Sequence, residues 1–406
     1  MLWAMAGKKR EKVTEEKITG LKYFDRLMPL FAPLQDVGCA RDKAGNRKLH
    51  MDQYCTLILL FLFNPIVTSL RGLQQASELR KVQRKFGCLR AGLGSLSEAT
   101  DVFEPERLHT IAEQLLNDIT VLPHDTRLDE LKQALIAVDG TLLKRLPQIT
   151  QAAWQSHRHP DGWRLHTQFE ILRGVPRRMD LTDGRNHGPS NEKAVLRNTL
   201  EKDCCYVTDR GYEQFSLFNA IVDAGSSYVC RVRGDHHFSA DEQRPLSPTA
   251  EAEGVVYDGI GTLGSPKSTR IEHPHHRVRL IRIHVQPHPK RGGNKRQLGS
   301  GELVLATNLL DVPAELLALL YHHRWLVELF FRFFKHVLGC RHLLSHDPVG
   351  IEIQTYCAII ACLLISLTTG RKPTLRTYEM ICFYFTGLAD EEELLAHISK
   401  LKQADA

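Results

Sequence analysis

The chain has 406 residues, of which 43% are hydrophobic and 25% are charged. This composition excludes a disordered chain and is typical of a globular protein with a sizeable core, and the length suggests two or three domains. The formal net charge of +6 is mildly basic. It permits a nucleic-acid partner but does not require one.

Ten cysteines are present, and none forms a CxxC pair or a Cys/His spacing typical of a zinc site. Several lie in apolar runs, where a reduced thiol behaves as a small hydrophobe. We therefore expect a reducing cytosol and no disulfide framework. The apolar runs 56–63 and 356–367 fall short of the ~20 residues that a membrane span requires. Both are expected to be buried helices of a cytoplasmic protein without a membrane partner.

The first third of the chain is expected to be a polar arm at residues 1–20, followed by a helical N-terminal domain at 21–125. A break that contains Gly87, Gly92 and Gly94 lies within this domain. Short helices around such a break are compatible with a helix-turn-helix or with a plain helical bundle.

Residues 76–86 are expected to form an amphipathic helix with one basic side. Leu79, Val82 and Phe86 would share the apolar face, and the opposite face carries four basic residues. The basic side could contact DNA phosphates or remain a solvated surface.

From about residue 132, strand and helix patterns alternate. In chain order we expect a buried strand at 134–140, a hairpin of 163–172 with 177–182, a helix at 191–200, a strand at 204–212, a helix at 213–225, a strand at 226–233, a strand at 302–309 and helices from residue 313. Residues 234–300 are rich in Pro, Gly, His and basic residues with short β-like runs. This order predicts an α/β fold with a β-rich insertion.

Two aspartates are expected at the ends of apolar strands. Asp139 follows the run "ALIAV" and Asp209 follows "CCYVT". Acids at strand ends often line functional clefts in α/β folds. An aspartate before a glycine is also a common turn former, so each residue taken alone has an ordinary structural interpretation.

A third acid lies in the stretch "YHHRWLVELFFRFFKHVLG" at 321–339. On one continuous helix, Tyr321, Arg324, Glu328 and Lys335 would fall within an arc of roughly 60°. Aromatic and aliphatic residues would occupy the other side. The polar stripe could face a cleft or be a solvated face with an Arg324–Glu328 pair.

Three converging carboxylates would repel one another unless cations neutralise them. Oxygen-only ligation favours Mg²⁺ or Mn²⁺, and two such ions suit phosphoryl displacement. Asp139, Asp209 and Glu328 are therefore candidate catalytic residues and metal ligands. Arg324 and Lys335, on the same side as Glu328, are candidate DNA-phosphate contacts. Tyr321 could donate a hydrogen bond to a phosphate or stack on a nucleotide.

Together these residues resemble a known family. The spacing Tyr, two residues, Arg, three residues, Glu, six residues, Lys is met by Tyr321, Arg324, Glu328 and Lys335. It resembles the YREK motif of the insertion-sequence-four group of DDE transposases, and "VDGT" (138–141) and "TDRGY" (208–212) resemble the acidic motifs of that group.

The resemblance implies a ribonuclease-H-like catalytic core with a β-rich insertion, beside the N-terminal helical domain. It assigns two Mg²⁺ or Mn²⁺ ions to the three acids, and phosphate contacts to Tyr321, Arg324 and Lys335. It implies metal-dependent cleavage at insertion-sequence ends and strand transfer into target DNA through a hairpin intermediate. Hairpin-forming members use an insertion-domain Trp, whereas this chain has Trp only at positions 3, 154, 163 and 325.

This interpretation also predicts the domain bounds. The core comprises 130–233 and 301–370, the insertion 234–300 and a C-terminal helical tail 371–406. The partners are double-stranded DNA and a second copy of the chain on DNA, and the expected location is the cytoplasm at the nucleoid. The basic stretch 290–297 could form a loop over DNA or a solvated loop. The alternative functions are a metal-dependent nuclease without strand transfer and an inactive DNA-binding protein.

Overall fold

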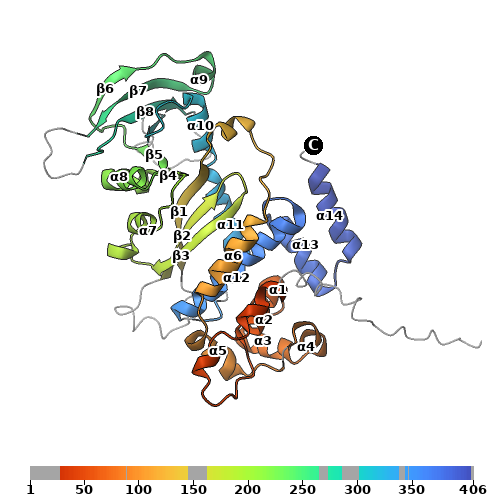
Figure 1. Cartoon of the computed structure of the whole chain (residues 1–406). Helices are drawn as coiled ribbons and strands as arrows, with labels where there is room; N and C mark the ends of the chain where they lie inside the picture. Colours follow the sequence, from red (N-terminus) through yellow and green to blue (C-terminus); the bar gives the residue numbers. More distant parts are fainter. Residues whose placement is uncertain are drawn as a thin grey trace, which may run out of the picture. The chain divides into compact units, whose positions relative to one another are not determined.

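The computed structural model describes residues 28–87, 89–144, 162–264, 273–285, 301–337, 343–345 and 347–403 (Figure 1). The chain forms two compact units. The first comprises residues 1–115, 336–365 and 374–406, and the second comprises 116–335 and 366–373. The division after residue 335 falls inside the segment assigned above to the catalytic core, so the predicted domain bounds remain a prediction. The arm 1–20 and the basic stretch 290–297 lie outside the described residues.

The first unit is helical. Its elements are α1 (Met28–Phe31), η3 (Ala32–Leu34), η4 (Cys39–Arg41), α2 (Met51–Phe63), α3 (Leu70–Ser77), α4 (Arg80–Phe86), α5 (Leu93–Val102), most of α6 (Glu106–Asn117), most of α12 (Pro348–Thr369), α13 (Leu375–Thr386) and α14 (Glu391–Gln403). The Tyr378 hydroxyl, on α13, donates to the carbonyl oxygen of Leu62 on α2. Segments far apart in sequence thus pack together within this unit.

The expected helix over 76–86 is two helices in the structure. α3 ends at Ser77, and Leu79 has extended backbone angles and is 57% exposed. Val82 and Phe86 are buried on α4, as predicted, while Arg80 is exposed. Leu79 is therefore not part of the apolar face, because it lies in the turn before α4.

The apolar run 356–367 belongs to α12, a helix of 22 residues. By length and composition this helix could cross a membrane, although the apolar run alone is too short. Within the most apolar 18-residue stretch of this helix, 89% is buried inside the protein. The helix therefore has the environment of a core helix, as the sequence predicts.

The second unit is built on one nine-stranded sheet with the order β3-β2-β1-β4-β5-β9-β8-β7-β6. The strands are β1 (Ala134–Lys144), β2 (Gly162–Glu170), β3 (Val175–Asp183), β4 (Cys204–Thr208), β5 (Ser227–Val232), β6 (Phe238–Gln243), β7 (Val255–Leu263), β8 (Val278–His284) and β9 (Glu302–Thr307). The helices are η5 (Thr126–Glu130), η7 (Gly188–Ser190), α7 (Glu192–Asn198), η8 (Arg210–Tyr212), α8 (Phe215–Asp223), α9 (Pro248–Ala252), α10 (Ala314–His322) and most of α11 (Trp325–Val337). The predicted α/β class is confirmed.

The pairing of the strands is mixed. β2 is antiparallel to both of its neighbours, β1 and β3, so the predicted hairpin of β2 with β3 is confirmed. β1, β4 and β5 run parallel. From β5 outward through β9, β8, β7 and β6 every pair is antiparallel. The strands between residues 234 and 300 therefore extend the same sheet through β9.

The two faces of the sheet carry different helices (Figure 1). Even-numbered residues of the parallel strands, such as Ile136, Tyr206 and Tyr228, form a buried core with Leu196 of α7 and Phe218 of α8. The opposite face packs on α11, where the rings of Phe169 and Phe330 lie 5.3 Å apart. Because side chains alternate along a strand, odd-numbered residues of β1, β4 and β5 point to the α11 side.

The boundaries around the candidate acids differ from the expectation. The strand expected at 204–212 ends at Thr208, and Arg210–Tyr212 form the short helix η8. β1 continues to Lys144, so Asp139 is not the end of a strand. The stretch 321–339 is not one helix, because α10 ends at His322 and α11 begins at Trp325. The Arg324 amide donates to the carbonyl oxygen of Tyr321 at 3.1 Å, three residues back, which is the tighter bonding of a 3₁₀ turn. Tyr321 therefore belongs to α10, and Arg324 lies in the turn.

A buried ion pair ties the outer strands to the segment before α10. Arg279 of β8 and Asp258 of β7 are 2% and 4% exposed, and the guanidinium donates to the carboxylate at 2.7 and 2.8 Å. Arg279 Nη1 also donates to the carbonyl oxygens of Leu310, at 3.0 Å, and Val312. The strands β7 and β8 are thus fixed to the chain that leads into α10.

Candidate active site

Asp139 and Asp209 lie side by side on neighbouring parallel strands. The last paired residues of β1 and β4 are Val138 and Thr208, and each aspartate directly follows one of them. Neighbouring strands are about 4.8 Å apart, so the two backbones are adjacent at this level. β1 continues past Asp139, but its parallel pairing with β4 ends at Val138. The apolar run of the sequence ends at the same residue.

Glu328 reaches this site through Arg324. Arg324 Nη1 lies 3.7 Å from Asp139 Oδ2, and Arg324 Nη2 donates to Glu328 Oε1 at 2.5 Å. The Arg324 side chain is only 14% exposed. The expected pair between Arg324 and Glu328 is present, but it faces Asp139 rather than open solvent. At Arg324 and Glu328 the polar stripe therefore lies against a strand aspartate.

The carboxyl of Asp139 has an unusual environment. Burial is the main cause that raises its pKa to about 6, and the negative charges of Asp209 and Glu328 raise it further. The Gly140 amide, which donates to Asp139 Oδ1 at 2.8 Å, and the Arg324 guanidinium oppose this rise. The three acids are therefore close enough to interact electrostatically, and Arg324 compensates their charge only in part.

Gly140 is needed because a side chain packs against it. A Cβ atom on Gly140 would lie 2.5 Å from Oε1 of Glu192, at the start of α7. Glu192 is held there by an ion pair with Arg164 of β2. A larger residue after Asp139 would therefore displace Glu192 from its ion pair with Arg164.

Asp209 has a second local role. Its Oδ1 accepts a hydrogen bond from the Gly211 amide at 2.8 Å and caps the short helix η8. This bond fixes one oxygen of the carboxylate. The motif "TDRGY" thus combines an acid at the end of β4 with the turn that orients it.

Tyr321 and Lys335 complete the residues expected from the sequence. The Arg324 Cζ atom lies 6.0 Å from the centre of the Tyr321 ring. Burial raises the pKa of Tyr321 to about 12, although Arg324 and Arg231 both act to lower it. Lys335 is half-buried on α11, seven residues after Glu328 and so on the same side of that helix.

Sequence reasoning missed Arg231, which lies in the same row as the two aspartates. The last pair between β4 and β5 is Thr208 with Cys230, so Arg231 follows at the level of Asp209. Arg231 is exposed, whereas the other residues of β5 are buried. The alternation in "SSYVCRVR" predicted this exposure, because Arg231 and the buried Cys230 point to opposite faces of the strand.

The donor set suits a hard divalent cation, because all three groups are carboxylates. Burial is the main cause of the raised pKa of Asp139, and the charges of Asp209 and Glu328, which add to the rise, are what a cation would offset. Among the described residues, no three acidic, His or Cys side chains converge closely enough to hold an ion as they stand. Arg324 instead contacts two of the three carboxylates. Ligation would require these side chains to turn toward a common point.

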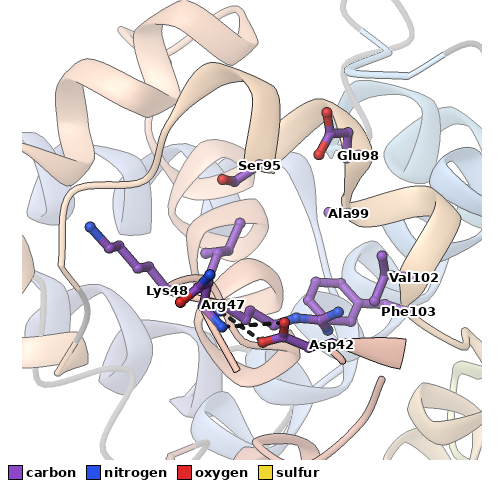
Figure 2. Close-up of a pocket in the computed structure, with 10 residues that line it drawn as sticks. Asp42, Arg47, Lys48, Ser95, Glu98, Ala99, Val102 and Phe103 are labelled. Atoms are coloured by element: carbon purple, nitrogen blue, oxygen red, sulfur yellow. Dashed lines mark hydrogen bonds between the residues drawn. The ribbon is translucent and has the colours of Figure 1, made fainter. Parts of the chain in front are cut away.

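A separate cavity of about 360 Å³ belongs to the helical unit (Figure 2). It lies between the segment that precedes α2 and the helix α5. Figure 2 shows Asp42 bonded to the backbone of Arg47, at 2.8 Å, and the Arg47 guanidinium beside the Phe103 ring, whose centre is 5.6 Å away. Lys48 and Glu98 add charges of both signs to the lining. This mixture does not select one class of ligand.

Comparison with known proteins places the acid site in a family. Residues 130–364 match the family described as "Transposase DDE domain". This range contains all six residues predicted from the sequence.

Two curated relatives are 26% identical to the chain. "Putative transposase y4zB" of Sinorhizobium fredii aligns over 208 residues, which is 51% of this chain and 53% of that protein. "Probable transposase for insertion sequence element IS5377" of Geobacillus stearothermophilus aligns over 212 residues, 52% of this chain and 50% of that protein. The chain thus matches about half the length of these relatives.

A solved structure is also similar, at a low level. It is described as the piggyBac transposase synaptic complex with hairpin DNA, and it is 13% identical with a TM-score of 0.38. The alignment covers 96% of this chain and 85% of that chain. The family match spans more than half of the chain, and the protein belongs to the transposase DDE domain family.

Proposed function

We propose that this protein is a DDE transposase that cuts DNA at the ends of an insertion sequence and transfers the cut strand into target DNA. The observation that carries the proposal is the arrangement of Asp139, Asp209 and Glu328. Two of these acids lie side by side on parallel strands, and the third is linked to Asp139 through Arg324. Family membership supports an enzyme that acts on DNA.

The sheet order supports a ribonuclease-H-like core. Two antiparallel strands flank β1, and the parallel strands β4 and β5 continue on its other side. Helices α7 and α8 cover one face, and α11 brings the glutamate to the other. The strands β6, β7 and β8 then form the insertion between the second aspartate and the glutamate. Assignment to the insertion-sequence-four group rests on the YREK spacing.

We propose that Asp139, Asp209 and Glu328 hold two divalent ions, Mg²⁺ or Mn²⁺. Bound ions of this kind would activate the attacking oxygen and neutralise charge on the leaving oxygen. The protein side chains supply the remaining functions. The Gly140 amide and the Gly211 amide each fix one carboxylate oxygen of their aspartate, at 2.8 Å.

Tyr321, Arg324 and Lys335 are proposed to contact DNA phosphates. Arg324 can bind a phosphate in a bidentate fork, and it lies next to the acids. The Tyr321 phenol stays protonated at neutral pH, so its hydroxyl can donate to a phosphate oxygen. These groups would hold the strand in the site and oppose the repulsion between phosphates and carboxylates.

We also propose that cleavage passes through a DNA hairpin at the transposon end. It rests on the YREK resemblance, and residues 234–300 contain no Trp to stabilise a flipped base. Tyr257 of β7 is a candidate substitute, although its ring is already stacked by Arg282, whose Cζ lies 5.7 Å away. Native and denaturing gels of the cut ends, which separate hairpins from open ends, would decide this step.

The N-terminal helices are proposed to help recognise the DNA ends. The exposed basic side chains of α4, among them Arg80 and Lys81, would supply phosphate contacts. We propose that two copies act together on paired ends and that the protein works at the nucleoid in the cytoplasm. Cross-linking with and without end DNA would test the dimer.

The deciding experiment uses the DNA that flanks the gene on both sides. Wild-type protein with Mg²⁺ or Mn²⁺ should nick these ends and join them to a target plasmid. The variants D139N, D209N and E328Q should bind the ends with little change but yield no cleavage. A strand-transfer assay separates a transposase from a nuclease, and binding without any product would indicate an inactive DNA-binding protein. Failure of the wild type to bind or cut either end would overturn the proposal.

A further inference from the structure

Arg231 is an exposed arginine in the middle of the sheet, and its side chain makes no hydrogen bond or ion pair with any residue that the structure describes. β5 lies between β4 and β9, so it is not an edge strand. Every other residue of β5 is buried. A solvated guanidinium on a central strand is available to an anionic ligand.

The strand register places this guanidinium at the acid site. Val138 pairs with Thr208 and Thr208 pairs with Cys230, so the residues that follow form one row across β1, β4 and β5. The row is Asp139, Asp209 and Arg231. Their side chains share the α11 face, and adjacent strands in the row are about 4.8 Å apart.

Tyr321 provides an independent indication of the same placement. Its phenol is close enough to both Arg231 and Arg324 for each positive charge to act on its pKa. Arg324 is already engaged by Asp139 and Glu328, whereas no described side chain pairs with the Arg231 guanidinium. The two arginines therefore approach the site from different elements, the turn before α11 and the strand β5.

We propose that Arg231 binds a backbone phosphate of the DNA strand that lies across Asp139 and Asp209, in addition to the contacts of Tyr321, Arg324 and Lys335. This inference rests on the proposed function and names a further residue of the same site. Arginine suits the role because its planar fork matches two phosphate oxygens. With Arg324 on the other side of the acids, the strand would be held by a guanidinium on each side.

The test measures binding of the flanking DNA with Ca²⁺ in place of Mg²⁺, over a range of KCl concentrations. R231Q should bind about tenfold more weakly, because a charge-assisted hydrogen bond is lost. The slope of log K against log [KCl] should be smaller in magnitude by about 0.9, which corresponds to one phosphate contact. R231K should restore the slope but only part of the affinity.

K202Q is the matched control, because it removes one positive charge at the other end of β4. Lys202 is 77% exposed and lies 3.9 Å from Asp203. Its substitution should change neither the affinity nor the slope. Equal losses in K202Q and R231Q, or an R231Q protein that matches the wild type, would overturn the inference. A loss of affinity that accompanies a fall in Tm of more than about 5 °C would make Arg231 structural and would also overturn it.

A scan of neutral methylphosphonates identifies the phosphate. At one position near the cleavage site, a methylphosphonate should weaken DNA binding by the wild type but not by R231Q. At every other position, the effects of the methylphosphonate and of R231Q on the binding free energy should add. Additivity at every position would contradict the contact. Cleavage by the wild type is scored separately, so a failure of the proposed chemistry is distinguishable from a failure at Arg231.

Discussion

The guanidinium of Arg324 lies 3.7 Å from the carboxylate of Asp139 and also binds Glu328. One cationic side chain thus lies between two of the three acids proposed to hold divalent ions. The same side chain is the proposed phosphate ligand. It therefore has competing partners, and its position should respond to the binding of metal and DNA.

Replacement of Arg324 by glutamine should separate these partners. R324Q is expected to bind Mn²⁺ about fivefold more tightly than the wild type without DNA, because a competing charge is removed from partly exposed carboxylates. DNA binding should become weaker. Electron paramagnetic resonance titration of Mn²⁺ measures the first effect. Y321F serves as the uncharged control, and weaker Mn²⁺ binding by R324Q would contradict the competition.

Substitution of Gly140 tests the packing behind Asp139. In G140A the new Cβ would lie 2.5 Å from Glu192 Oε1, so Glu192 and its partner Arg164 must move. We expect the free energy of unfolding to fall by about 1–3 kcal/mol and cleavage to be impaired. Urea unfolding measures the first effect.

The control for this substitution is G234A, where the nearest atom to a new Cβ would be a Val304 methyl at 3.6 Å. Its stability should stay within about 0.5 kcal/mol of the wild type. In an E192A background, G140A should be less destabilising than alone. Additive effects of G140A and E192A would show that the two residues are not coupled.

His166 should make stability depend on pH. Burial lowers its pKa from 6.5 to about 4, so below pH 6.5 the unfolded chain binds a proton that the folded protein does not. The contribution of His166 to the free energy of unfolding is fully present above about pH 6.5. It falls by about 3 kcal/mol as the pH drops to 4 and below. Urea unfolding at several pH values should show a shallower decline for H166Q. Parallel curves for the two proteins would argue against a buried neutral imidazole.

Substitution of one partner of the buried pair Arg279–Asp258 should strongly destabilise the protein. D258A leaves a buried guanidinium without its carboxylate, so the free energy of unfolding should fall by about 3–5 kcal/mol. The double variant R279M/D258L should be closer to the wild type, because no unpaired charge remains. Chemical denaturation compares the three proteins. A D258A protein as stable as the wild type would show that water reaches the pair.

Much of this protein was determined by local sequence patterns. Alternating apolar residues predicted β2 and β5, and the turn that follows β2 predicted its hairpin with β3. Local patterns also predicted β9, α7 and α8, because these signals depend on neighbours within one element. The apolar runs before Asp139 and Asp209 indicated the strands that carry these acids. The spacing from Arg324 to Glu328 predicted their contact, since it is one helical turn.

Only the tertiary structure decided how these residues meet. The parallel register of β1, β4 and β5 aligns Asp139, Asp209 and Arg231, and no local pattern specifies which strands become neighbours. The space beside Gly140 is filled by Glu192, 52 positions away in the printed sequence. The break between α10 and α11 likewise came from hydrogen bonds that periodicity does not report. Periodicity records which face of an element is buried, whereas the partner of that face is set by long-range packing.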